Sequence, residues 1–181
     1  MDIISVSASE ILTWNGKEFK CALGKGGVVQ NKTEGDEATP QGCFPIRDVL
    51  YRADKVAMPA THLPVFAIRK NDGWCDDVND PRYNRKISLP YPASHEKLWR
   101  EDDLYDVVVT LGYNDDPAVP GKGSAIFIHI ARPNYAPTAG CIALSLPDML
   151  QILKGIPAES TVCIIKDTKA DRDTHLVAQP V

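Results

Sequence analysis

The sequence predicts a β-rich mixed α/β domain with one main helix. Short segments rich in β-branched and aromatic residues alternate with turns of Gly, Pro and Asn, which is typical of β-structure with long loops. One stretch carries helix signals: Ser145 as the N-cap, Pro147 in the first turn and Asp148 at the third helical position. The 181 residues suit one domain, which we expect over residues 1–166, followed by a polar tail over residues 167–181.

The expected strands are short apolar or alternating runs that turn residues bound on both sides. They cover residues 11–14, 18–23, 43–46, 64–69, 105–111, 124–130 and 161–166, and the helix starts after Ser145 and stops at Gly155. The run 124–130 is apolar on both faces, which is typical of a central strand. Residues 70–100 form a polar stretch that contains two Trp and two Tyr, so we expect a long, ordered lid loop.

Composition excludes several classes of protein. Lys and Arg number 20 against 24 Asp and Glu, and a net charge of −4 argues against a nucleic-acid binder. No apolar run is long enough to cross a membrane, and residues 1–7 lack a basic export region. We therefore expect a cytoplasmic protein, with export by a signal-independent secretion route as the alternative. Five cysteines, an odd number without a C-x-x-C pair, favour a reducing compartment over a disulfide framework.

The residues with the most chemical content lie between positions 123 and 144. His129 lies near the end of the predicted strand 124–130, where an imidazole can reach the rim of a sheet. Gly140 and Cys141 follow just before the helix, and a glycine there leaves backbone N–H groups free for an oxyanion. A histidine beside a cysteine can take the thiol proton, so the pair predicts a nucleophilic thiol. On spacing alone, a buried structural Cys and a core His are the commoner outcome.

This region resembles the YkuD-type L,D-transpeptidase catalytic domain, whose motif is a His, a spacer, Ser/Thr-His-Gly-Cys, an apolar residue and Asn or Arg. His129 matches the first His, and Thr138, Gly140 and Cys141 match the later block. Residues 32–44 resemble the family's G-D-x-x-T-P-x-G-x-F loop. The resemblance covers nearly the whole chain and implies a β-sandwich with one main helix after the catalytic Cys and a long lid.

Three positions depart from the family pattern. Ala139 replaces the second His of the motif, and Ala143 replaces the usual Asn or Arg. The spacer between His129 and Thr138 has only eight residues, which is shorter than the family's usual spacer. These departures bear on specificity and leave the Cys–His pair intact.

The resemblance implies cysteine-dependent acyl transfer. Cys141 would attack a peptide carbonyl, His129 would take its proton, and N–H groups near Gly140 would stabilise the oxyanion. In relatives the substrate is a peptidoglycan stem peptide or muropeptide, cut between a diamino acid and D-Ala, and no cofactor is implied. Water as acceptor makes an L,D-carboxypeptidase for peptidoglycan recycling, which we expect for a cytoplasmic chain.

Three other functions remain open at this point. An amine acceptor would make a true L,D-transpeptidase that forms cross-links or exchanges D-amino acids. Secretion would make the chain an effector that attacks another cell's wall. A wall-peptide binding module without catalysis is a further alternative, because Ala139 and Ala143 replace polar residues of the motif. Zinc bound by Cys141 and His129 is disfavoured, because no second Cys or His lies at ligand spacing.

Further residues are candidates for contact with the substrate peptide: Tyr113, Arg132, Thr138, Trp74, Asp76 and Asn84. Tyr113 matches in order the Tyr that lines the oxyanion side in relatives, and Arg132 could bind a carboxylate with two hydrogen bonds. The segment from Trp74 to Asn84 offers the aromatic face and acids of a lid, and these acids could receive the ammonium group of a diamino acid. Core-edge packing and solvated surface charges are the alternatives for these side chains.

Overall fold

β-Strands dominate the chain. The computed structural model describes residues 2–166, so the predicted tail over 167–181 lies outside the described residues. The elements in order are β1 (Ile3–Ser7), β2 (Ile11–Trp14), β3 (Lys17–Lys20), β4 (Val28–Val29), β5 (Thr39–Pro40), β6 (Gly42–Tyr51), β7 (Val65–Ala67), β8 (Asp72–Cys75), β9 (Lys86–Ser88), β10 (His95–Lys97), β11 (Val107–Leu111), β12 (Phe127–Ile130), the 3-10 turn η1 (Pro133–Tyr135), β13 (Ile142–Leu144), α1 (Leu146–Gly155) and β14 (Thr161–Ile165).

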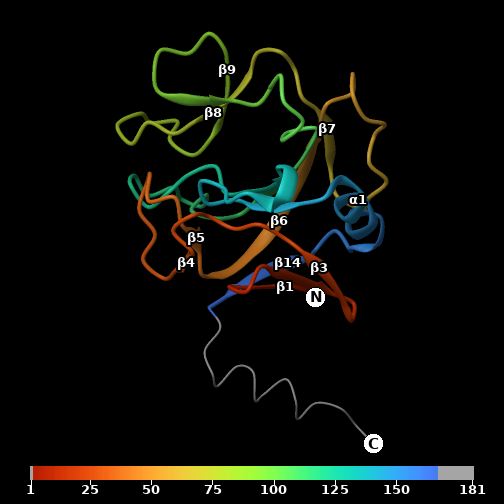
Figure 1. Cartoon of the computed structure of the whole chain (residues 1–181). Helices are drawn as coiled ribbons and strands as arrows, with labels where there is room; N and C mark the ends of the chain where they lie inside the picture. The colour runs from red at the N-terminus through yellow and green to blue at the C-terminus, as the bar shows by residue number, and fades with distance from the viewer. Residues whose placement is uncertain (1, 167–181) are drawn as a thin grey trace, which may run out of the picture.

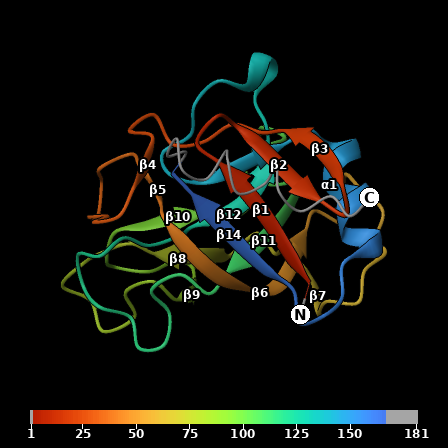
Figure 2. The same ribbon diagram turned by 90° about the horizontal axis from the view of Figure 1, so that it is seen from below.

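One long strand, β6, connects the two halves of the main sheet. The strand order is β13-β12-β11-β6-β14-β1-β2-β3, with β7 also paired to β6. Residues 42–45 of β6 pair with β14, whereas its later residues pair with β11. The pairing with β11 shifts register between Val109 and Leu111, and such irregularities let a strand bend. Figure 2 shows β6 curving past β14 and β11, so the halves face each other as layers of a sandwich.

The two ends of this strand order also meet. Ala22, just after β3, exchanges two backbone hydrogen bonds of 2.9 Å with Ala143 in β13. The contact joins the first and last strands of the order and so closes the sandwich on one side. It also holds β13, and with it the segment that carries Cys141, against the N-terminal half of the chain.

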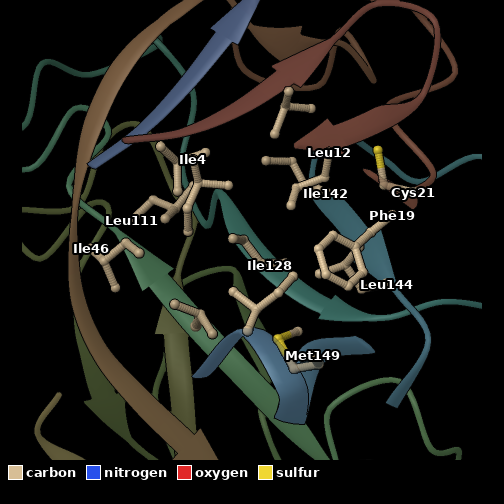
Figure 3. Close-up of a cluster of buried hydrophobic side chains, with 14 of the residues drawn as sticks. Ile4, Leu12, Phe19, Cys21, Ile46, Leu111, Ile128, Ile142, Leu144 and Met149 are labelled. Atoms are coloured by element: carbon tan, nitrogen blue, oxygen red, sulfur yellow. The ribbon is translucent and has the colours of Figure 1, made fainter. Parts of the chain in front are cut away.

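The main core lies between the two layers, as Figure 3 shows. Side chains from β1 to β3 meet side chains from β12, β13 and α1: Ile4, Leu12, Phe19, Ile128, Ile142, Leu144 and Met149. Each fully buried Ile or Leu contributes about 1.5–3 kcal/mol to folding. None of the helices within residues 2–166 is long and apolar enough to span a bilayer.

A smaller second cluster lies on the other face of β12. Phe127 packs there with Leu98, Tyr105 and Cys141, whereas Ile128, the next residue, faces the main core. This alternation follows from the two-residue period of a strand. Because Phe127 and His129 share a face, the histidine points to the same side as the cysteine.

The predicted lid is an ordered small sheet. Its three strands run in the order β10-β8-β9, and Figure 1 shows β8 and β9 at the opposite end of the molecule from β1 and β14. Residues 70–100 are ordered, as the aromatic content of this stretch indicated, but they form three short strands where a loop was expected. The lid strand β10 brings its residues toward the second cluster.

Most predicted elements are confirmed, with differences at their ends. The helix begins after Ser145, whose hydroxyl accepts a hydrogen bond from the Asp148 N–H at 3.2 Å, and it ends at Gly155. β6 extends beyond the predicted run 43–46, and β1 was not expected as a strand. β12 begins at Phe127 because Ala125 has φ 52°, which interrupts an extended strand.

The prediction that the cysteines form no disulfide is wrong for two of them. Cys43 in β6 and Cys163 in β14 are directly opposite each other in the antiparallel register and form a disulfide. The two residues are 120 positions apart in the sequence, so their spacing carried no signal of the pairing. Cys21, Cys75 and Cys141 are free thiols.

Candidate active site

A cavity of about 590 Å³ opens between the lid and the end of β12. Its walls come from the loop that precedes β5, from β10, and from the turn that precedes β13. The side chains that matter for chemistry are Cys141, His129, Thr138, Arg132, Glu96 and Tyr105. The structure thus brings the predicted nucleophile and the predicted base into one cavity, although their catalytic roles stay predictions.

Cys141 lies at the floor of this cavity with 9% of its surface exposed. Its S–H donates to the Ala125 carbonyl at 3.2 Å, and its sulfur accepts the Phe127 N–H at 3.4 Å. Burial raises the pKa of this thiol to about 12, and the charge of Glu96 adds to the increase. The resting sulfur is therefore a protonated thiol that needs a base before it can attack.

His129 has the arrangement of such a base. Its Nδ1 lies 2.9 Å from the Ile130 carbonyl oxygen, which can only accept, so Nδ1 carries the proton and Nε2 keeps its lone pair. Burial lowers the pKa of the imidazole below its usual 6.5, which keeps the ring neutral at neutral pH. The ring also packs edge-on against Tyr105 at 5.5 Å between centroids. No hydrogen bond joins His129 to Cys141 within the described residues, so the thiol must turn away from Ala125 to reach it.

Hydrogen bonds within the turn before Cys141 fix its conformation. The Thr138 hydroxyl accepts the Gly140 N–H at 3.1 Å and donates to the Cys141 carbonyl at 2.6 Å. The Thr138 hydroxyl therefore positions Cys141, and because Thr138 also lines the cavity, its contact with substrate stays a prediction. The Cys141 N–H has no acceptor among the described residues, which makes it the better oxyanion donor of the two N–H groups.

The segments that carry the two sequence motifs, residues 32–44 and the turn before Cys141, approach each other closely at glycines. Gly140 has φ 135°, and a Cβ there would lie 2.7 Å from the Ala38 carbonyl oxygen. A Cβ on Gly24 would lie 2.9 Å from the Gly140 Cα, and the Gly24 N–H donates to the Thr39 hydroxyl at 2.8 Å. The T-P segment of the first motif therefore supports the backbone that presents the cysteine of the second.

Asp36 of the first motif holds its own loop. Its carboxylate accepts hydrogen bonds from the Thr33 N–H at 2.8 Å, the Ala38 N–H at 2.9 Å and the Lys32 ammonium at 2.5 Å. Burial alone would raise the pKa of Asp36, but these hydrogen bonds lower it overall. Asp36 therefore stabilises the loop whose neighbouring residues Gly35 and Glu37 line the cavity.

Asn84 and Trp74 support the site from behind instead of lining the cavity as substrate-binding residues. Asn84 is buried, and its Oδ1 accepts the Trp74 Nε1–H at 2.9 Å and the Ala125 N–H at 3.0 Å. Its Nδ2 donates to the carbonyls of Tyr113 and Asn114. Because Ala125 in turn accepts the thiol of Cys141, Asn84 links the lid to the nucleophile.

The remaining candidate substrate-binding residues lie either in the cavity wall or outside it. Arg132 and Asp76 line the cavity, and their role in substrate binding stays a prediction. Tyr113 lies outside the wall: its hydroxyl donates to the Lys122 carbonyl and its ring packs edge-on against Phe44 at 5.2 Å. The expected place of Tyr113 on the oxyanion side is therefore not what the structure has.

The two alanine departures also differ in position. Ala139 lines the cavity, whereas Ala143 is buried in β13 opposite His129 in the parallel register. The change at Ala139 therefore alters the wall that a substrate meets, and the change at Ala143 alters the packing behind the histidine.

Sequence reasoning missed Glu96 and Tyr105. The Tyr105 hydroxyl donates to Glu96 Oε1 at 2.6 Å, and both side chains line the cavity beside Cys141. Tyr105 stands just before β11 and looks like a core aromatic in the sequence, and Glu96 sits in a polar loop. No local pattern marks either residue, because their place depends on how the lid folds.

A β-sandwich that presents Cys141 and His129 to a shared cavity is a domain suited to thiol acyl transfer. The chain belongs to the YkuD family: the model of the L,D-transpeptidase catalytic domain matches residues 3–165. The family resemblance drawn from the two motifs and the fold it implied are therefore confirmed. No curated protein matches the sequence.

Solved L,D-transpeptidase structures are similar to the chain at low sequence identity. The enzyme from Xylanimonas cellulosilytica is 12% identical, with a TM-score of 0.43 and coverage of 91% of this chain and 60% of that one. L,D-transpeptidase 1 from Mycobacterium tuberculosis is 12% identical, with a TM-score of 0.40 and coverage of 92% and 62%. The helical cell shape determining protein Pgp2 from Campylobacter jejuni is 14% identical, with a TM-score of 0.45 and coverage of 92% and 48%. The chain thus spans about half to three fifths of the length of these proteins.

Proposed function

We propose that this chain is a cysteine acyltransferase that cleaves the bond between the diamino acid and D-Ala of a peptidoglycan stem tetrapeptide. The observation that carries the proposal is the shared cavity of Cys141 and His129 in a YkuD-family domain. The donor peptide would enter this cavity with its scissile carbonyl above the sulfur. Arg132 on the wall is suited to a carboxylate of the peptide, since a guanidinium can bind one with two parallel hydrogen bonds.

The proposed reaction has two stages. His129 Nε2 takes the thiol proton, the sulfur attacks the carbonyl carbon, and the Cys141 N–H stabilises the oxyanion. The C–N bond then breaks, the leaving amine of D-Ala takes the proton from His129, and a thioester remains on Cys141. An acceptor attacks the thioester, gives its proton to His129, and displaces the thiolate, which recovers a proton from the imidazolium.

Water is the acceptor that we favour, which makes the chain an L,D-carboxypeptidase. A second peptide must gain a large proximity advantage through its own contacts to outcompete water. The loop between His129 and Thr138 is short, and Ala139 presents only a methyl group to the cavity. Both features support few contacts for a second peptide beside the thioester.

Transpeptidation is the second candidate, and one observation favours it. A cavity of about 700 Å³ adjoins the first and shares Leu104 and Arg132 with it. An acceptor amine could approach the thioester from that side. The ratio of the products on a defined peptide distinguishes the two reactions.

The disulfide bears on where this reaction would take place. Disulfides persist in oxidising compartments and are rare in the cytosol, so the Cys43–Cys163 bridge supports an extracytoplasmic site of action over the expected cytoplasmic one. We therefore favour the secreted, wall-targeting alternative over peptidoglycan recycling inside the cell. The chemistry proposed for Cys141 is the same in either compartment.

The experiment that tests the proposal is incubation of the purified protein with a defined stem tetrapeptide, followed by mass analysis. We expect tripeptide and free D-Ala as the main products, and D-amino acid exchange product when millimolar D-amino acid is added. The Cys141→Ala protein is the control and should form neither. Dimer as the main product would show a transpeptidase, and no Cys141-dependent product would support a binding module instead.

A further inference from the structure

Glu96 is a half-buried carboxylate that the proposed reaction does not use. It lies in the middle of β10 and lines the cavity together with Cys141 and His129. Burial raises the pKa of Glu96 above its ordinary value, because a carboxylate loses hydration in the cavity wall. Placing a carboxylate in this cavity wall costs hydration free energy, which indicates that Glu96 has a role in the site.

Glu96 forms no salt bridge within the described residues, although the charge of Arg100 acts to lower its pKa. Its hydrogen bond comes from the Tyr105 hydroxyl at 2.6 Å, which is a neutral donor. The nearby guanidinium of Arg100 is engaged with the Asp102 carboxylate at 2.8 and 2.6 Å. The cavity ammonium of Lys32 is likewise engaged with Asp36 at 2.5 Å. Taking a carboxylate partly out of water without a paired counter-ion is costly, so the charge of Glu96 is only partly compensated in the free protein.

Asp76 adds a second carboxylate to the same part of the cavity. It follows β8, whose residue Trp74 is the register partner of Glu96, and its charge further raises the pKa of Glu96. The Oδ1 atom of Asp76 is buried and has no hydrogen-bond partner in the described part of the chain. Two carboxylates, one in β10 and one just after β8, therefore line one cavity, and neither forms an ion pair within residues 2–166.

The charge of Glu96 also acts against the nucleophile. After burial, it is the next contribution that raises the pKa of the Cys141 thiol. A negative side chain beside the sulfur disfavours the thiolate that the reaction requires. A cation bound between the two would remove this opposition, because it neutralises the carboxylate and attracts the thiolate at once.

We propose that Glu96 determines substrate specificity by binding an ammonium group of the acyl donor beside Cys141, with Asp76 as its neighbour in the subsite. This inference rests on the proposed function, because a stem peptide with a diamino acid carries such an ammonium group close to the scissile bond. Donors with a free side-chain amine are substrates, and donors whose amine is acylated are rejected. Binding of the correct peptide also favours formation of the thiolate, so that recognition and activation are coupled.

The test measures binding apart from turnover. The Cys141→Ala protein is titrated calorimetrically with a stem tetrapeptide whose side-chain amine is either free or acetylated. We expect the free amine to bind about 10- to 100-fold more tightly, which is the range for one hydrogen-bonded charge pair. In the Cys141→Ala, Glu96→Gln protein this preference should vanish, since glutamine keeps the acceptor for Tyr105 but lacks the charge. Glu101→Gln, which removes an exposed charge from the same segment, is the matched control and should keep the preference.

A second measurement reports on the thiol itself. Alkylation of Cys141 by iodoacetamide, followed by peptide mapping to separate it from Cys21 and Cys75, should be faster in Glu96→Gln than in the native protein at the same pH. Thermal unfolding of each variant confirms that it is folded.

The outcomes separate the specificity proposal from the proposed function. A Glu96→Gln protein that is folded and still prefers the free amine overturns the specificity proposal, as does equal binding of both peptides to the parent protein. Selective binding without any Cys141-dependent product supports the subsite and refutes the acyltransferase activity.

Discussion

Loss of the Cys43–Cys163 disulfide should destabilise the protein without unfolding it. The bridge spans 120 residues of chain, for which the chain-entropy model yields about 5 kcal/mol, and native disulfides typically contribute about 2–5 kcal/mol. The backbone pairing of β6 with β14 surrounds the bridge and does not require it, so the fold should persist after reduction. For a domain of this size we expect the melting temperature to fall by roughly 5–15 °C.

The assay is thermal or urea unfolding with and without a phosphine reductant, in comparison with the Cys43→Ser, Cys163→Ser double variant. The double variant should melt at the temperature of the reduced native protein and should not respond to reductant. Mildly acidic buffer suppresses exchange with the three free thiols, because the thiolate is the attacking species. A native protein whose unfolding midpoint is the same with and without reductant would refute both the bridge and the argument for an oxidising compartment.

Three further predictions concern the candidate site. Cys141→Ala and His129→Ala should each abolish turnover, and their losses should not add; additive losses would contradict a dyad. The acid limb of the pH profile of kcat/KM should lie below pH 6.5, because the lowered pKa of His129 keeps the base neutral there. Gly140→Ala should cost at least about 2 kcal/mol in urea unfolding, since its φ and the Ala38 contact both exclude a side chain, whereas Gly16→Ala, with open space around it, should cost only about 1 kcal/mol. Asn84→Ala should cost about 2–4 kcal/mol, because it leaves buried N–H and carbonyl groups without partners, and should also slow turnover; unchanged turnover would refute its link to the nucleophile.

Elements of the fold that depend on neighbouring residues could be predicted from local signals in the sequence. The helix after Ser145 is an example, because its cap, its first-turn proline and its terminal glycine all lie within ten residues of one another. The pair of Cys141 and His129 was also accessible, since a glycine next to the cysteine and a histidine at a strand end are chemical signals. The family motifs favour a catalytic role for this pair over that of an ordinary core Cys and His, and this role stays a prediction.

Features that depend on pairing between distant segments could not be read in the same way. β6 continues through Arg47 and Asp48, which look like loop residues in the sequence, because β11 pairs with β6 on both sides of them. The disulfide depends on the register of β6 against β14, and Glu96 reaches the cavity only because β10 pairs with β8. Tertiary contacts determine these positions, so local sequence patterns do not predict them.

The glycine contact beneath the nucleophile has a consequence for protein engineering. Gly24 lies so close to Gly140 and to the Glu37 carbonyl that three separate stretches of backbone share one space without any side chain between them. A graft that transplants only the turn with Cys141 into another scaffold would leave behind the two surfaces that shape it. The transferable unit is therefore the set of all three stretches, and recombination between family members should succeed only when crossover points keep that set together.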